Sequence, residues 1–180
     1  HCNINITTDS TVFLAAPIAQ RVRIIVTPSS DGDSVNVGGV SLTGSFVWGD
    51  DTPGFVFTNK LGNAPKLIAE CCTHESGHTL GLIHQSTYNG SCTLLATYNE
   101  GVGTGQTGWA PIMGNSYYRN LTGWNNGPTP SGCTNDQDNL SIITSRNGFT
   151  YRPDDYSDNP AVNPATINIV NTQFSIGGII

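Results

Sequence analysis

Three of the four histidines of this 180-residue chain lie in one short stretch, between His74 and His84. His74 and His78 are four positions apart, so on a helix they share a face and can present two imidazole rings to one ion. Glu75 projects from nearly the same face, where its carboxylate can reach a water on the ion rather than the ion itself. Gly81 lets the backbone turn sharply, which brings His84 round as a third nitrogen ligand. Three imidazoles with an open fourth position are typical of a catalytic zinc site, not of a closed structural one.

The residues of this stretch leave two other interpretations open. The histidines could be ordinary core or solvated residues of a helix, or the site could bind zinc without catalysing a reaction. Cys71 lies one helical turn before His74 on a similar face, so its thiolate could be a fourth, inhibitory ligand. We favour a buried apolar thiol at this position.

The order of residues 74–84 is His-Glu-Ser-Gly-His-Thr-Leu-Gly-Leu-Ile-His. It resembles the extended zinc-binding signature of the metzincin clan of metallopeptidases, H-E-x-x-H-x-x-G-x-x-H. Met113, the only methionine, lies in the segment Ala-Pro-Ile-Met-Gly, which resembles the Met-turn that packs beneath the metal in that clan. Gln85, the residue after the third histidine, matches none of the main families. Segments 105–114 and 151–155 look like those of large secreted bacterial multidomain proteins that carry a metzincin domain.

The resemblance implies a zinc-dependent endopeptidase that hydrolyses peptide bonds of extracellular or surface proteins. Zinc held by neutral imidazoles lowers the pKa of its water to about 7. Glu75 would act as the general base on that water and would pass the proton to the leaving amine. The alternative function is a catalytically silent metzincin-like module with a binding or structural role in a surface adhesin or assembly. Glu75 argues against this alternative, because a purely structural zinc site has no use for a general base.

Aromatic residues around the methionine raise a further question about the cleft. In some metzincin families a tyrosine shortly after the methionine assists the transition state or caps the metal. Tyr117 and Tyr118 follow Met113 at a different spacing. For Tyr117 a transition-state role and a packing or rim role therefore both stay open. Trp109 could form a wall of the specificity pocket or pack in the core.

Alternation of apolar and polar residues, together with β-branched residues, predicts the first elements of the fold. The expected strands are residues 3–9, 21–28, 39–48 and 54–59. A helix then begins with Asn63 as its N-cap and Pro65 in its first turn, and Gly81 is placed to end it in a left-handed conformation. The first part of the chain is thus a small sheet followed by the histidine-bearing helix.

The rest of the chain shows less periodicity. Residues 85–135 predict an irregular subdomain, and a last helix is expected to run to about Arg146 with Asp136 or Asp138 as its cap. The chain is therefore expected to be α+β. The resemblance implies a metzincin-like arrangement, in which a twisted, mostly parallel sheet and the active-site helix precede an irregular lower subdomain that ends in a C-terminal helix.

The same resemblance implies a domain layout. The four strands would be the last four of the usual five, so the first strand and the helix after it would lie before His1. We expect the catalytic domain to span residues 1–151. Residues 152–180 would form a linker and a C-terminal strand, or the start of a following β-rich module of a larger multidomain chain. The strand 39–46 would be the sheet edge that lines the cleft, either pairing with an extended peptide or closed by its own loops.

Charge and composition exclude other functions. The net charge is −6 and the seven lysines and arginines are scattered, so no basic stripe is available for nucleic acid. The sequence contains no run of 18 apolar residues, so no membrane span is predicted. The expected partner is a protein or peptide substrate. The chain begins without Met or a signal peptide, so it reads as a processed or excised piece of a secreted or cell-surface protein.

The chain has five cysteines, an odd number that cannot all be paired within it. Cys92 and Cys133 both lie in segments rich in Gly, Asn and Ser, where exposed thiols would be a liability, so we expect a disulfide between them. Cys2 could pair with Cys71 or Cys72, which would leave one buried free thiol.

Oxygen-rich segments raise the question of calcium. The candidate clusters are Asp31 and Asp33 with Asn36, Asp136 and Asp138 with Asn135, and the pair Asp154 and Asp155. Such clusters could bind Ca²⁺, although solvated turns and helix caps are the more common role of these residue types.

Overall fold

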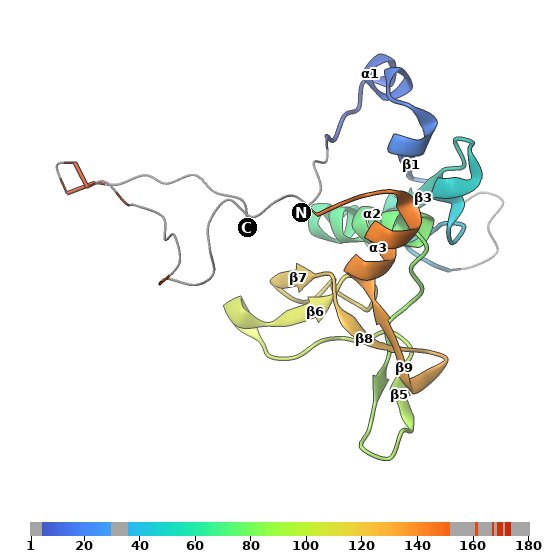
Figure 1. Ribbon diagram of the computed structural model, residues 1–180. Coiled ribbons are helices and arrows are strands. Elements are labelled where there is room, and N and C mark those ends of the chain that lie inside the picture. Colours follow the sequence, from blue (N-terminus) through green and yellow to red (C-terminus); the bar gives the residue numbers. More distant parts are fainter. Residues whose placement is uncertain are drawn as a thin grey trace. The chain divides into compact units, whose positions relative to one another are not determined.

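Helices and small sheets alternate along the described part of the chain. The computed structural model describes residues 5–29 and 36–151, together with residues 161, 167, 169, 170, 172 and 173. The chain divides into two units, one of residues 7–148 and one that joins residues 1–6 to residues 149–180. Every element named below lies in the first unit (Figure 1). Its mixture of helices and strands confirms the α+β class.

A three-stranded sheet precedes the long helix. β1 (Ile24–Thr27) and β3 (Gly54–Phe57) pair in parallel. β2 (Gly39–Val40) pairs antiparallel with β3, so the strand order is β1-β3-β2 and β2 lies at an edge. The strands expected at 21–28 and 54–59 are confirmed at residues 24–27 and 54–57, where β-branched and aromatic side chains favour an extended backbone. Residues 58 and 59 belong instead to a 3-10 turn.

The strand expected at residues 3–9 is wrong where the structure describes it. Residues 5–9 form no strand, and α1 (Ser10–Ala15) begins directly after them. The Asp9 side chain caps this helix by accepting the Thr11 backbone N–H at 2.8 Å. Ile6 is 90% exposed, so the apolar side of the alternation has no core to cover.

The strand expected at residues 39–48 is also wrong beyond its first two residues. Gly44 and Gly49 have φ angles of 79° and 80°, a left-handed conformation that ends an extended strand. Between them the backbone forms the short 3-10 helix η2 (Ser45–Trp48). The other 3-10 turns are η1 (Ile18–Gln20), η3 (Thr58–Leu61) and η4 (Gly105–Thr107).

The long helix α2 (Pro65–Thr79) follows the sheet, and its boundaries are set by local backbone signals. Pro65 is the first helical residue, as expected, but the N-cap is Ala64 and not Asn63. Asn63 instead has a φ of 54°, so it belongs to the turn before the cap. At the other end Gly81 has a φ of 96°, which confirms that it ends the helix in a left-handed conformation.

The sheet and α2 share one small core. Its buried residues are Val56, Leu61 and Cys71, and partly buried apolar side chains from β1, α2 and the segment at Tyr117 pack against them. The α2 helix, drawn in green in Figure 1, therefore rests on the sheet through its Cys71 side. This packing fixes the helix that carries the first two histidines.

The chain beyond α2 folds as short strand pairs, which the weak periodicity did not predict. β6 and β7 pair in parallel, whereas β4 with β5 and β8 with β9 are antiparallel. The strands are β4 (Thr87–Tyr88), β5 (Leu94–Ala96), β6 (Trp109–Pro111), β7 (Leu121–Gly123), β8 (Asn126–Thr129) and β9 (Gly132–Asp138). The expected last helix is confirmed as α3 (Asn139–Asn147), which Asp138 caps by accepting the Ser141 N–H.

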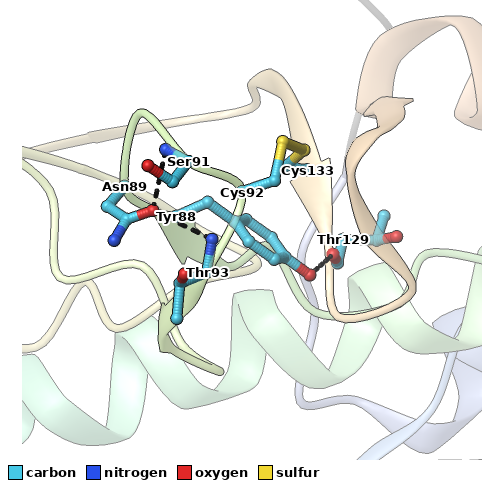
Figure 2. Close-up of a disulfide and its surroundings, with 7 residues drawn as sticks. All are labelled: Tyr88, Asn89, Ser91, Cys92, Thr93, Thr129 and Cys133. Atoms are coloured by element: carbon cyan, nitrogen blue, oxygen red, sulfur yellow. Dashed lines mark hydrogen bonds between the residues drawn. A yellow bond between two sulfur atoms is a disulfide. The ribbon is translucent and has the colours of Figure 1, made fainter.

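The predicted disulfide ties two of these strand pairs together. Cys92, in the turn between β4 and β5, is bonded to Cys133 of β9. Beside it the Tyr88 hydroxyl donates to the Thr129 carbonyl at 2.8 Å (Figure 2). The β4–β5 hairpin is thus fixed to the β8–β9 hairpin by a covalent bond and a hydrogen bond.

The sequence left open whether Cys71 or Cys72 pairs with Cys2, and the structure shows both helical cysteines as free thiols. Cys71 is 1% exposed and belongs to the core between α2 and the sheet. Burial raises the pKa of its thiol to about 12, so the thiol stays protonated and inert.

The expectations for residues 152–180 fall mostly outside the described residues. Among those that are described, Val170 and Gln173 form an isolated antiparallel bridge. Within the described ranges, the structure contains no helix long and apolar enough to cross a membrane.

Candidate metal centre

Three imidazole rings converge at the C-terminal end of α2. His74 and His78 lie on successive turns of the helix, and the turn at Gly81 carries the chain back to His84. The Nε2 atoms of His78 and His84 are 3.1 Å apart, and the ligand nitrogens of all three residues lie within 4.8 Å of one another. No other group of three or more His, Cys, Asp or Glu residues in the described part of the chain could hold a metal ion. The three predicted ligands therefore meet.

Backbone carbonyls fix the tautomers of the two helical histidines. Nδ1 of His74 lies 2.7 Å from the Ile112 carbonyl oxygen, and Nδ1 of His78 lies 2.8 Å from that of Leu82. A carbonyl oxygen only accepts hydrogen bonds, so each Nδ1 must carry the proton and donate it. Each Nε2 then presents a lone pair to the space that the rings share. This is the arrangement in which metal-bound histidines are usually oriented.

Burial also keeps the three rings neutral. It lowers the pKa of His74 to about 3 and that of His84 to about 4, and the neighbouring His78 lowers both further in the same direction. The pKa of His78 is lowered by burial as well. A neutral imidazole is the form that binds a metal, so the site needs little proton release before it can accept an ion.

Glu75 lies beside the rings in a different environment from an ordinary surface carboxylate. It is 4% exposed, and its Oε2 atom has no hydrogen-bond partner in the described structure. Burial raises the pKa of the carboxyl to about 7, and the nearby Ser41 hydroxyl offsets only part of this. Such a carboxyl can take up and release a proton near neutral pH, as a general base or acid must.

The sheet edge approaches this carboxylate very closely. A Cβ atom on Gly39 of β2 would lie 2.7 Å from Glu75 Oε1, 2.7 Å from the Phe55 carbonyl oxygen and 2.8 Å from Cys71 Sγ. No room therefore exists for a side chain at Gly39. Glycine lets the backbone of β2 form one wall of the site against α2.

Buried glutamines hold the segment that carries His84. The Gln137 side chain accepts the Ile83 N–H at 2.9 Å and donates to the Ile83 carbonyl at 2.8 Å. The fully buried Gln85 side chain donates to carbonyls of the β8–β9 hairpin, among them that of Gln137 at 3.0 Å. The residues on both sides of His84 are thus tied to the same hairpin. Sequence analysis noted Gln85 only as unusual, and nothing in the spacing pointed to Gln137.

The Met113 turn contacts each part of the site. Met113 is 0% exposed, and a Cβ atom on Gly77 would lie 2.5 Å from its sulfur, so the thioether packs against the helix between His74 and His78. The Ile112 carbonyl accepts from His74, and the Met113 carbonyl accepts the Gln85 N–H at 2.8 Å. One turn therefore supports the helix and the loop that meet at the rings.

The rings open into a cavity of about 650 Å³. Besides the histidines and Glu75, its walls come from residues 37–41 and 43 at the sheet edge and from residues 114–118 with Tyr98. Glu75 is the only acidic residue that lines the described cavity, and neither lysine nor arginine lines it. The cavity is therefore nearly neutral apart from the histidines and this one carboxyl group.

The aromatic residues predicted near the site lie in different places. Tyr117 lines the cavity, but it also packs against the core, and burial together with the Cys71 thiol raises the pKa of its hydroxyl. Tyr118 is 77% exposed at the rim, and Trp109 is not among the residues that line the cavity. Sequence analysis missed Tyr98, whose ring centroid lies 4.3 Å from that of His84.

In the described ranges, none of the candidate calcium clusters brings three Asp or Glu side chains together. The Asp138 carboxylate caps α3, and the Asn135 side chain accepts from the Thr129 hydroxyl at 3.3 Å. Residues 31, 33, 154 and 155 lie outside the described residues, so calcium at those positions stays a prediction.

No protein-family model, curated protein or solved structure matched the chain when it was compared with each of these sets. The functional assignment therefore depends on the chemistry of the site.

Proposed function

We propose that the chain is the catalytic domain of a secreted zinc-dependent endopeptidase related to the metzincins. The observation that carries the proposal is the convergence of His74, His78 and His84 beside the buried carboxyl of Glu75 in one open cavity. A metal site with three protein ligands, an adjacent general base and room for a substrate suits hydrolysis. A purely structural site would use a fourth protein ligand instead.

The donor set favours zinc. Three neutral imidazoles are common zinc ligands, and none of the hard oxygen ligands that calcium or magnesium requires is among them. Two nitrogens that each lie about 2.1 Å from a tetrahedral zinc ion are about 3.4 Å apart. The 3.1 Å between the Nε2 atoms of His78 and His84 is close to this separation, so these two side chains need only a small adjustment. The ligand nitrogens of all three histidines lie within 4.8 Å of one another.

The residues of the chain can perform the proton transfers of peptide hydrolysis. Zinc in such a site supplies Lewis acidity, which polarises a carbonyl and makes water a stronger acid. Glu75 accepts a proton from the attacking water through its free Oε2 atom and returns it to the leaving amine. The carbonyls of Ile112 and Leu82 keep His74 and His78 in the tautomer that leaves each Nε2 free.

The fold supports the relation to metzincins. The sheet precedes the histidine-bearing helix, and the edge strand β2 is antiparallel to β3 beside the cavity. The only methionine packs beneath the same helix turn. β2 can therefore offer backbone groups to an extended peptide, while the neutral walls favour peptides with uncharged side chains next to the scissile bond. The disulfide suits a secreted protein.

The test compares the zinc-loaded protein with two variants on denatured casein. Glu75→Gln is expected to bind one zinc ion per chain but to lose at least about 100-fold in activity, because the general base is gone. Glu100→Gln removes an exposed carboxylate outside the cavity and is expected to match the wild type. A chelator should abolish wild-type cleavage, and added zinc should restore it.

Two outcomes would overturn the proposal. Retention of more than a few per cent of activity in Glu75→Gln would remove Glu75 from its role. Stoichiometric zinc binding without cleavage of denatured proteins or of a peptide library would favour the alternative, a metzincin-like binding or structural module.

A further inference from the structure

The third histidine differs from the first two in how its ring is held. His74 and His78 each donate from Nδ1 to a backbone carbonyl. In the described part of the chain, Nδ1 of His84 has no protein hydrogen-bond partner, and its Nε2 faces that of His78. The hydrogen bonds of Ile83 and Gln85 fix the backbone around His84. Among the described residues, the only polar contact of the His84 ring itself is that of Nε2 with the His78 ring.

Tyr98 supplies the missing contact. Its ring centroid lies 4.3 Å from that of His84 with an angle of 45° between the planes. Aromatic rings at this separation attract each other. The Tyr98 hydroxyl makes no hydrogen bond to a protein atom in the described structure, so the ring itself is the group that contacts the site.

The backbone on either side of Tyr98 is fixed to the segment that carries His84. The Thr97 carbonyl accepts from the Ser86 hydroxyl at 2.7 Å, and the Asn99 N–H donates to the Gln85 carbonyl at 2.7 Å. The Asn99 carbonyl in turn accepts the N–H of Asn115 at 2.7 Å. Tyr98 therefore lies in a segment that hydrogen bonds hold directly beside His84, not in a free loop.

We propose that Tyr98 is a positioning residue that orients the His84 ring for the metal by ring packing, the role that backbone carbonyls play for His74 and His78. The inference rests on the proposed zinc site, but it concerns a residue that is not one of its ligands. Loss of a group that orients a metal ligand typically lowers metal affinity by 10- to 100-fold. The ring should matter here and the hydroxyl should not.

The test measures zinc affinity by competition with a chromophoric chelator in the intact chain. Tyr98→Ala is expected to weaken zinc binding by about 10- to 100-fold, whereas Tyr98→Phe keeps the ring and should stay within about 3-fold of the wild type. Tyr118→Ala is the matched control, because Tyr118 lines the same cavity without a ring contact to a histidine. The visible spectrum of the cobalt-substituted protein should change in Tyr98→Ala and be restored in Tyr98→Phe.

Far-UV circular dichroism identifies a variant that fails to fold. In that case Tyr98→Leu, which keeps an apolar side chain but removes the aromatic ring, replaces Tyr98→Ala. Unchanged zinc affinity in Tyr98→Ala would overturn the inference, as would an equal loss in Tyr98→Phe, since the hydroxyl would then be responsible. If the wild type binds zinc but either of these two results is found, only the positioning role of Tyr98 is disproved. If the wild type binds no zinc, both the role of Tyr98 and the proposed function are disproved.

Discussion

The candidate metal centre has two halves that are built by different means, a helix half with His74, Glu75 and His78 and a loop half with the segment around His84. His74, Glu75 and His78 come from α2, and helix geometry alone places them on one face. His84 comes from a chain segment without regular structure, and side-chain amides, backbone bonds and an aromatic ring hold it in place. A helix thus needs only periodicity to align ligands, whereas a loop needs a set of specific contacts for one ligand.

The loop half also depends on bonds far from the rings. Gln85 and Gln137 tie the His84 segment to the β8–β9 hairpin, and the disulfide ties that hairpin to β4–β5. The helix half rests instead on the core of Val56, Leu61 and Cys71. Substitutions in the two halves should therefore have distinct effects, which the following variants test.

Removal of the disulfide should have the largest effect on the loop half. Cys92 and Cys133 are 41 residues apart, and closure of a loop of this length stabilises the folded state by about 4 kcal/mol. The double variant Cys92→Ser with Cys133→Ser should lose about this free energy of unfolding, measured by urea denaturation. Cys72→Ala, which removes a free thiol, should lose less than about 1 kcal/mol. Equal stability of the double variant and the wild type would contradict the role given to the bond.

Gln137→Ala should weaken the link between the hairpin and the third ligand. It leaves the Ile83 N–H and carbonyl without their partners, at a cost of about 2–3 kcal/mol. Zinc affinity should fall by at least about 10-fold, because His84 is no longer held next to a fixed backbone. Gln106→Ala, at an exposed position of η4, is the control. A stable variant with wild-type zinc affinity would show that the glutamine does not position His84.

Gly77→Ala tests the contact at which the two halves meet. The new Cβ would lie 2.5 Å from Met113 Sδ and 3.2 Å from the Trp124 ring. Overpacking should outweigh the better helix propensity of alanine, and we expect a net loss of about 1–2 kcal/mol in thermal or urea unfolding. Gly90→Ala, where nothing lies within 4 Å of the added atom, should be neutral. Stabilisation by Gly77→Ala would mean that Met113 does not press on the helix.

The smallest effect is expected at the end of the loop half. Asp138→Ala removes the side chain that caps α3 through the Ser141 N–H, which should cost about 1 kcal/mol. Asp138→Asn keeps an acceptor at the same position and should stay within a few tenths of a kcal/mol of the wild type. Similar unfolding midpoints for the alanine and asparagine variants would show that the cap contributes nothing.

The same contrast explains what the sequence could predict. The helix half was predictable, because the spacing of His74 and His78, the proline at the start and Gly81 at the end are all local signals. The disulfide was predictable from the composition of the segments around Cys92 and Cys133, whereas the place of Met113 beneath the helix was expected only from the resemblance to metzincins. The contacts of Gln85, Gln137 and Tyr98 were not, since each joins positions far apart in the chain with no shared period.

The errors in the sheet have a physical cause as well. The alternation at residues 3–9 does not say whether a hydrophobic core lies next to this segment. In the structure Ile6 is exposed, so its side chain packs against no core. The strand expected at 39–48 pairs only over Gly39 and Val40, and Gly44 with its positive φ then turns the chain into η2 instead of extending it. Local pattern indicates what a segment can form, while the contacts that it finds decide what it does form.

A crystal structure of the zinc-loaded protein, with anomalous data collected at the zinc absorption edge, tests the proposed zinc site most directly. We expect one anomalous peak per chain, about 2.0–2.1 Å from Nε2 of each of His74, His78 and His84. A peak bound by the two helical histidines without His84, or no peak between the rings after zinc loading, would contradict it.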